Sequence, residues 1–266
     1  MSSASPCLKR LALMADQLVR PSPGLVVLIY HRVGGGTRSP IDLDVEEFAW
    51  QMKYLADNDL AVTLDEGLRR LESEDPAQGV VVTFDDGTRD FGDVAVPIMV
   101  EFGVPSLLYA ETSPITTGRP NAAGLEPTDW TTLGEAVATG LVQIGSHTHN
   151  HRLLRDVDGA EAAEELDLSI AAISANIGVV PHHFAYPKAV DGSPAANREI
   201  RQRFSSAALA GGGSNRSGTD PYRLQRTPIQ RSDSRRMFQA KIAGGMRLEG
   251  MVRDIVAVRR YRKLQS

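Results

Sequence analysis

Short apolar runs that alternate with amphipathic stretches constrain the fold of this chain more than any other feature of its sequence. Each run is rich in Val, Ile or Leu and is followed by a polar or helical stretch, the order expected for a parallel α/β sheet. Such a sheet is either closed as a barrel or open and doubly wound. We expect strands at residues 25–30, 61–64, 80–84, 106–110, 141–144, 183–186 and 205–209, and helices at residues 45–56, 94–102, 131–139, 160–175 and 195–204.

The expected helix at residues 160–175 shows its periodicity clearly. Apolar side chains recur at three- and four-residue spacing and form one buried stripe. The same spacing places Glu161, Glu164 and Glu165 on the outer side of the helix. The stripe consists of Ala163, Leu166, Ile170 and Ile173.

Size and composition favour a single domain and exclude some classes of function. The chain has 266 residues, of which 42% are hydrophobic, enough to bury one large core. Segments rich in Gly, Ser and Pro at residues 34–40, 112–124 and 211–221 are expected to be long loops inside that domain. Cys7 is the only cysteine, which excludes an internal disulfide and a cysteine-based zinc site. A formal net charge of -4 provides no general basic field for nucleic acid.

The amino-terminal apolar run at residues 11–15 follows Lys9 and Arg10 and ends at Asp16. It is shorter than the ~7–15 apolar residues of a signal peptide. No run elsewhere approaches the ~20 residues of a membrane span. A cytoplasmic protein is therefore expected.

Two adjacent carboxylates, Asp85 and Asp86, stand where the apolar run at residues 80–84 ends. Ionised groups at the end of a buried strand are costly unless they are paired, and a metal ion is the simplest partner. Neighbouring strand residues point to opposite sides, so one carboxylate can bind an ion while the other handles a proton, provided the chain turns at Gly87. Asp-Asp-Gly is also a common turn sequence, which is the alternative interpretation.

Histidines gather directly after the expected strand at residues 141–144. His147 and His151 have the four-residue interval that brings two imidazoles to one ion. With Asp86 they would leave positions open for water around the ion, as a catalytic site requires. His149 lies between them and is expected to point elsewhere, as an exposed or supporting histidine. The alternative is a solvated loop with incidental histidines.

Two further expected strands also end in polar residues. The strand at residues 183–186 leads into Pro187 and Lys188, and the strand at residues 25–30 leads into His31. Active sites of parallel α/β folds form at the carboxyl ends of the strands. Four strands therefore deliver candidate groups to one edge of the sheet.

From residue 25 to residue 229 the chain resembles the polysaccharide deacetylase family, the fourth carbohydrate esterase family. Residues 83–87 (Thr-Phe-Asp-Asp-Gly) are similar to its first motif, residues 147–151 (His-Thr-His-Asn-His) to its second and residues 184–187 (Phe-Ala-Tyr-Pro) to its third. The resemblance implies an α/β fold, a distorted (β/α) barrel of seven or eight strands, that binds a divalent metal, usually zinc.

The resemblance also implies roles for individual residues. Asp85 would be the general base, and the Lys188 N–H would face the oxyanion that develops on the amide carbonyl, because Pro187 has no N–H. The metal ligands would be Asp86, His147 and His151.

The chain departs from the family pattern at several places, among them Lys188 and Ala189, where the family usually has an aromatic residue and a Gly after the proline. Ala185 stands where the third motif often has an Arg that orients the base, and Arg226 is our candidate for that role. No histidine follows His183, so the late family motif that supplies the general acid has no counterpart. His31 is the expected substitute, because residues 30–33 (Tyr-His-Arg-Val) resemble the branch that includes poly-N-acetylglucosamine deacetylases. A buried structural histidine is the alternative. The residues expected around the substrate are Tyr186, Pro187, Lys188 and Arg226.

The predicted function is a metal-dependent deacetylase acting on an N-acetylated sugar. One alternative is a hydrolase of another linear or cyclic amide that uses the same metal site. A second is a sugar-binding domain whose catalysis has lapsed, although such a domain has no need for the Asp85 base beside a metal.

The predicted organisation is a barrel at residues 24–232, between a helical extension at residues 1–23 and a basic helical segment at residues 233–266. Basic and apolar residues are interleaved from residue 247 to residue 263. We expect this segment to pack on the barrel with its basic face in solvent; weak contact with an anionic membrane or a partner is the alternative.

Overall fold

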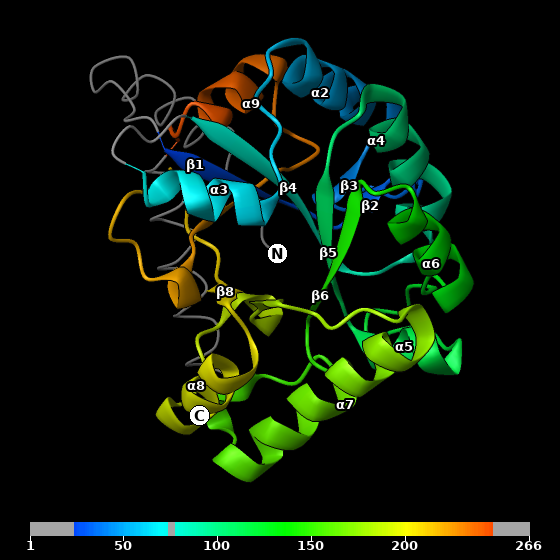
Figure 1. Ribbon diagram of the computed structural model, residues 1–266. Helices are drawn as coiled ribbons and strands as arrows, with labels where there is room; N and C mark the ends of the chain where they lie inside the picture. Colours follow the sequence, from blue (N-terminus) through cyan, green and yellow to red (C-terminus); the bar gives the residue numbers. More distant parts are fainter. Residues whose placement is uncertain (1–23, 74–77, 247–266) are drawn as a thin grey trace.

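The structure is a computed structural model that describes residues 24–73 and 78–246. Its centre is a sheet of seven parallel strands in the order β8-β7-β6-β5-β4-β1-β9 (Figure 1). Sequential strands lie side by side from β4 to β8, as crossover helices allow. The strands are β1 (Leu25–Tyr30), β4 (Gly79–Asp86), β5 (Ser106–Ala110), β6 (Val142–Ser146), β7 (His183–Ala185), β8 (Ser206–Ala208) and β9 (Arg226–Pro228).

The edge strands β8 and β9 approach each other through the segment that precedes β9. The Leu224 N–H donates to Ala207 O at 3.0 Å, and the Leu209 N–H donates to Leu224 O at 2.9 Å. The Gly211 N–H donates to Arg226 O at 3.0 Å. The sheet is therefore nearly closed, and the predicted distorted barrel is confirmed with seven strands.

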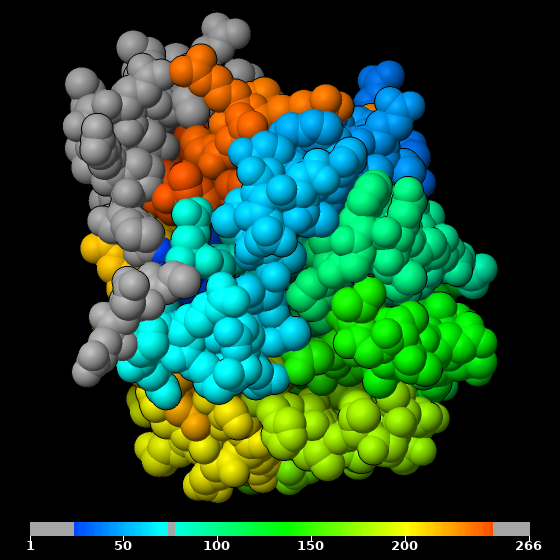
Figure 2. All heavy atoms as spheres, turned by 45° about the horizontal axis from the view of Figure 1, so that its top comes forward, coloured from blue at the N-terminus to red at the C-terminus, as the bar shows by residue number. Residues whose placement is uncertain are grey.

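Helices cover the outside of the sheet. The space-filling view shows α2, α4 and α6 as adjoining surfaces of this outer layer (Figure 2). A separate pair of short strands, β2 (Arg32–Val33) and β3 (Asp42–Leu43), precedes the first described helix. The helices are α2 (Val45–Asp57), α3 (Leu64–Leu71), α4 (Val96–Phe102), α5 (Thr112–Thr117), α6 (Trp130–Ala138), α7 (Gly159–Ile177), α8 (Pro194–Arg203) and α9 (Arg235–Ile242), with a π-helical turn η1 (Phe91–Ala95) and the 3-10 turns η2 (Leu154–Asp156), η3 (Pro187–Ala189) and η4 (Pro221–Arg223).

Apolar side chains fill both faces of the sheet. Val27, Val81 and Leu107 belong to one buried cluster with Leu64 of α3, so α3 packs against one face of the sheet. Val82 belongs to the cluster on the other face, together with side chains of α2 and α4. Burial on both faces explains the continuous apolar runs in the sequence, and each buried Val or Leu contributes about 1.5–3 kcal/mol.

Two local expectations are wrong. Of the expected strand at residues 61–64, only Ala61 forms a bridge to β4, and helix α3 begins directly afterwards. The helix starts there because Thr63 accepts a hydrogen bond from the Glu66 N–H at 3.2 Å and so caps it. The expected loop at residues 112–124 begins with the short helix α5.

Helix α9 is the described part of the predicted carboxyl-terminal segment. Its Phe238 is buried, with its ring centroid 5.9 Å from that of Trp50. The predicted extension at residues 1–23 and the basic stretch at residues 247–263 lie outside the described residues. Among the helices that the structure describes, none has the length and apolar character needed to cross a lipid bilayer.

Candidate active site

The register of the sheet brings residues of different strands to one edge. Asp86 pairs with Ala110 of β5, and Ala110 pairs with Ser146 of β6. Because these strands are parallel, Asp86 at the end of β4 and His147 directly after β6 lie at the same level of the barrel. This level is the carboxyl end, where active sites of parallel folds form.

Asp86, His147 and His151 lie together, as the sequence predicts for a metal site. An Asp86 carboxylate oxygen is 3.7 Å from His147 Nε2 and 3.6 Å from His151 Nε2. The three ligand atoms lie within 4.8 Å of one another, and no other group of His, Cys, Asp or Glu in residues 24–73 and 78–246 has this arrangement. The side chain of His147 is 2% exposed, whereas those of Asp86 and His151 are each 19% exposed. The cluster is therefore open to solvent on one side.

The backbone around the cluster adopts conformations that are rare for residues other than glycine. Asp86 has a φ of 73°, Thr148 of 66° and His151 of 54°. Each such residue costs on the order of 1–3 kcal/mol, and such residues gather at functional sites because the surrounding structure must hold them. Gly87, with a φ of 86°, permits the turn that the sequence analysis required after the two carboxylates.

The donor set fits a divalent cation. His147 Nδ1 lies 2.7 Å from Ala185 O, so Nδ1 carries the proton and the Nε2 lone pair faces Asp86. Burial and the neighbouring His147 lower the pKa of His151 to about 4, so this imidazole is neutral at pH ~7, as a ligand must be. Two imidazoles and one carboxylate suit Zn²⁺ and similar first-row ions.

Glu165 of α7 holds the chain between the two histidines. Its carboxylate accepts the N–H of His149 at 3.1 Å, the N–H of Asn150 at 2.9 Å and the Asn150 side-chain amide at 2.8 Å. The expectation that Glu165 faces outward is wrong, because a long side chain on the helix edge can turn back to a neighbouring loop. His149 Nδ1 lies 2.9 Å from Thr112 Oγ1, so this histidine points elsewhere than the metal cluster.

Asp85 and Arg226 form a buried bidentate ion pair. The Arg226 guanidinium donates to Asp85 Oδ1 at 2.6 Å and to Oδ2 at 2.9 Å. It also donates to Leu209 O at 3.1 Å. Burial alone would raise the pKa of Asp85, but the charge of Arg226 and its hydrogen bonds hold it well below its ordinary value. Asp85 is therefore ionised and fixed in orientation, the contact expected of Arg226 as an orienting residue.

Two residues that were expected around the substrate are buried instead. Arg226 has no exposed surface, and Tyr186 is 2% exposed. The Tyr186 ring packs on Phe184 at 5.2 Å between centroids, and its hydroxyl donates to Asn197 Oδ1 at 3.0 Å. Neither side chain can reach a substrate, so the expected contacts of Tyr186 and Arg226 are wrong. A motif match locates a residue in the chain but does not show where its side chain points.

The turn after β7 places the other two expected substrate contacts near the cluster. Pro187 is buried, whereas Lys188 is exposed and has a φ of 54°. The Lys188 ammonium lies within electrostatic reach of His151. Its backbone N–H donates to no acceptor in the described part of the chain, so it is available to a substrate.

His31 follows β1 at the same end of the barrel. It lies within electrostatic reach of Asp86, Asp85 and Arg226. Burial lowers the pKa of His31, and the charges of Asp86 and Asp85 oppose that shift without cancelling it. The His31 carbonyl is 3.5 Å from Thr88 Oγ1, and Thr88 lines an open cavity of about 380 Å³. The described residues that line this cavity include Arg32, next to His31, but not His31 itself or the residues of the metal cluster.

Glu111 belongs to the site but was missed by the sequence analysis. Its N–H donates to Asp86 O at 3.0 Å, and the residue is 6% exposed. Burial and the nearby charges of Asp86 and Glu165 raise the pKa of Glu111 to about 7. Its position directly after the expected strand at residues 106–110 was the available signal, because a polar residue at that point belongs to the same edge of the sheet.

Comparisons with known proteins identify the family and the fold. A family model described as polysaccharide deacetylase matches residues 72–209. The structure of IcaB from Ammonifex degensii is 27% identical with a TM-score of 0.73, covering 84% of this chain and 97% of that one. Deacetylase PplD from Streptococcus pyogenes, solved with acetate, is 20% identical with a TM-score of 0.74, covering 84% and 99%. The latter likeness shows the fold alone. No curated protein sequence matches the chain.

Proposed function

Because the chain belongs to the polysaccharide deacetylase family, we propose that it is a metal-dependent amide hydrolase that removes the acetyl group from an N-acetylated sugar or oligosaccharide. The observation that carries the proposal is the cluster of Asp86, His147 and His151 beside the buried Asp85 carboxylate. A domain that only binds sugar would need neither an oriented base nor open ligand positions.

Asp86, His147 and His151 would hold the cation, which we propose is Zn²⁺. When bound, it supplies Lewis-acid chemistry that lowers the pKa of water and polarises the amide carbonyl. The exposed sides of Asp86 and His151 are where water and substrate would approach.

Asp85 would take the proton from the attacking water. Arg226 holds both of its carboxylate oxygens, so the base is fixed before the substrate arrives. A carboxylate with a depressed pKa is a weak base, so Asp85 can act only on a water molecule that has already been acidified. The ion pair with Arg226 therefore fixes the orientation of Asp85 and makes it a weaker base.

His31, in its protonated form, would donate the proton that the nitrogen needs when the C–N bond breaks. Burial works against this form by lowering the pKa of His31, whereas the charges of Asp86 and Asp85 favour it. His31 directly follows β1, which pairs with β4, the strand that carries Asp85, so acid and base come from neighbouring segments. The free N–H of Lys188 would donate to the carbonyl oxygen as negative charge develops on it.

Acetate release from a panel of N-acetylated monosaccharides and short oligosaccharides tests the proposal. Protein loaded with Zn²⁺ is expected to release acetate from at least one of them. Removal of the metal with a chelator should stop the release, and one equivalent of Zn²⁺ should restore it. Release that continues unchanged after complete metal removal would contradict a metal-dependent mechanism.

Replacing His31 with Ala is expected to lower kcat for the amide substrate by about 10²–10⁴-fold, because the leaving amine must be protonated. Hydrolysis of an aryl acetate ester should fall much less, because its leaving group needs no proton. Zn²⁺ content, measured by atomic absorption, should not change. Equal losses on both substrates, or loss of the metal, would assign His31 another role. His182→Ala, at an exposed histidine, is the control.

Replacing Glu165 with Gln is expected to weaken Zn²⁺ binding by about 10–100-fold, as loss of a partner that orients metal ligands does. The amide oxygen of Gln can accept only part of the hydrogen bonds that the carboxylate takes from His149 and Asn150. Competition with a chelating dye gives the affinity directly. Glu164→Gln, at the exposed neighbouring position, should bind Zn²⁺ as the wild type does. Identical affinities in the two variants would refute the positioning role.

A further inference from the structure

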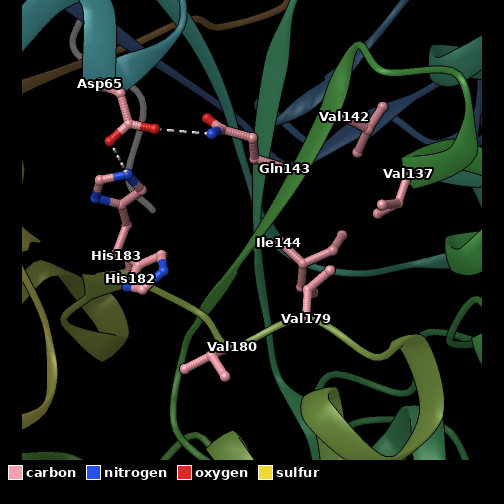
Figure 3. A pocket seen from close by; sticks show the side chains of 9 residues that line it. All are labelled: Asp65, Val137, Val142, Gln143, Ile144, Val179, Val180, His182 and His183. Carbon is pink, nitrogen blue, oxygen red and sulfur yellow. Dashed lines mark hydrogen bonds and ion pairs between the residues drawn. The ribbon is translucent and has the colours of Figure 1, made fainter.

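The amino end of the barrel contains a cavity that the proposed active site does not use. β6 and β7 form one register pair, Ser146 with Phe184, at the carboxyl end of β6. A cavity of about 370 Å³ lies beside the amino halves of these two strands (Figure 3). His147 follows Ser146 at the other end of β6, so cavity and candidate active site lie at opposite ends of the same strand. The volume suits a small ligand.

The polar end of the cavity is a connected group of side chains from separate elements. Asp65 of α3 reaches toward β6 and β7 (Figure 3). Gln143 Nε2 donates to Asp65 Oδ2 at 2.9 Å, and His183 Nε2 lies 3.2 Å from Asp65 Oδ1. His183 is 3% exposed, and its Nδ1 lies 2.9 Å from Ser206 Oγ. Because a carboxylate faces Nε2, a neutral His183 carries its proton there and Ser206 donates to Nδ1.

This group presents mainly acceptors to the cavity. Asp65 Oδ1 faces His183 Nε2 at 3.2 Å and Oδ2 accepts from Gln143, but each carboxylate oxygen has two lone pairs, so both keep accepting capacity. Gln143 donates through its amide nitrogen, which leaves its amide oxygen as an acceptor. Among the described residues that line the cavity, Asp65 is the only acidic one, and its side chain is 55% exposed. A ligand here must donate hydrogen bonds and is favoured by positive charge.

The other end of the cavity is apolar. Val142 and Ile144 of β6 line this end together with Val179, which lies next to Ile144, and Val180 (Figure 3). Val180 is 59% exposed, an unusual position for a large apolar side chain. A short alkyl chain laid along these side chains would be removed from water.

Two other uses of the polar group are excluded. Ser206, His183 and Asp65 have the connectivity of a nucleophile, a base and an acid, but Ser206 is 0% exposed and cannot reach a substrate. A second metal site is also excluded for the described part of the chain, because only the cluster containing Asp86 has the spacing of metal ligands.

We propose that this cavity binds a primary alkylammonium group. The ammonium lies against Asp65 and the Gln143 amide oxygen, and the alkyl chain packs along Val142 and Ile144. A free aliphatic amine and a lysine side chain of another protein share this chemistry. The proposal is independent of the deacetylase function, because it uses none of the residues assigned to that site.

Methyl NMR of the full chain, titrated with butylammonium at pH ~8, tests the proposal, because an alkylammonium with a pKa near that of lysine keeps its charge there. Saturable shifts are expected for the methyl groups of Val142, Ile144 and Val180. Butanol and butyrate should bind at least about tenfold more weakly, the factor that 1.4 kcal/mol of charge recognition produces. Butanol binding as tightly as butylammonium, or no saturable shift at these methyl groups, would overturn the proposal.

Two variants locate the ammonium. Asp65→Asn should weaken butylammonium binding about tenfold, whereas Asp57→Asn, on the exposed face of α2, should not change it. Val180→Lys should also weaken binding, because its own ammonium competes at the cavity mouth; this position is exposed and tolerates the change even if Asp65→Asn does not fold. Unchanged binding in the folded variants would overturn the proposal. An Nα-acetyl-lysine amide that binds more tightly than butylammonium assigns the site to a protein lysine, and the reverse order assigns it to a free amine.

Discussion

Replacing Asp85 with Asn is expected to lower kcat for acetate release by about 10²–10⁴-fold, because a carboxamide cannot accept the proton of the attacking water. Asp85 is 5% exposed, and Arg226 holds its carboxylate with two hydrogen bonds. Zn²⁺ content should be unchanged, since the proposed ligands are Asp86 and two histidines. Initial rates at saturating substrate, with metal content measured on the same samples, give both results.

The Asn variant also leaves the Arg226 charge without its partner in the protein interior. A lower free energy of unfolding is therefore expected, and the rates must be compared at a temperature where both proteins are fully folded by circular dichroism. Asp57→Asn, at an exposed residue of α2 that pairs with Lys53, is the matched control and should keep the wild-type rate. Undiminished acetate release by Asp85→Asn would remove Asp85 from the role of base.

The sequence predicts the barrel well because the sheet is buried on both faces. β1 and β5 have the bounds expected from their apolar runs, since nearly every residue in them must be apolar. Strand β9 was not predicted. It is short and contains Arg226 and Pro228, so its sequence lacks the apolar pattern of a buried strand. Its place in the sheet follows from the closure of the barrel, which depends on the whole fold and not on the local sequence.

For the site, the sequence predicted which residues follow the strands but not where each side chain points. Asp86 and His147 were predictable together because each follows an apolar strand, and parallel strands end at one edge. Tyr186 also follows such a strand, but its side chain turns inward to Asn197. Glu165 comes from a helix whose periodicity placed it in solvent, although its carboxylate contacts the metal loop. The spacing of residues along the chain specifies the direction of neither side chain.

Replacing Arg226 with Met is expected to lower the free energy of unfolding by about 3–5 kcal/mol at pH ~7, because it leaves the buried Asp85 carboxylate without a partner. Arg226 is 0% exposed, so water cannot replace it. Urea unfolding of the metal-free proteins, followed by circular dichroism, measures the difference. Arg69→Met, which removes an exposed partner of Glu66 on α3, should cost no more than about 1 kcal/mol.

The difference between wild type and Arg226→Met should shrink as the pH falls. In the wild type the pKa of Asp85 lies below its unfolded value of about 3.9, so the stability it contributes is present above that value and is lost only as the pH falls toward the folded pKa. In the variant, burial without Arg226 raises the pKa of Asp85 above the unfolded value. Asp85 then becomes neutral at a higher pH, which removes the penalty of an unpaired charge. A difference that stays constant from pH ~7 to pH ~4 would show that Arg226 acts through packing and not through the charge of Asp85.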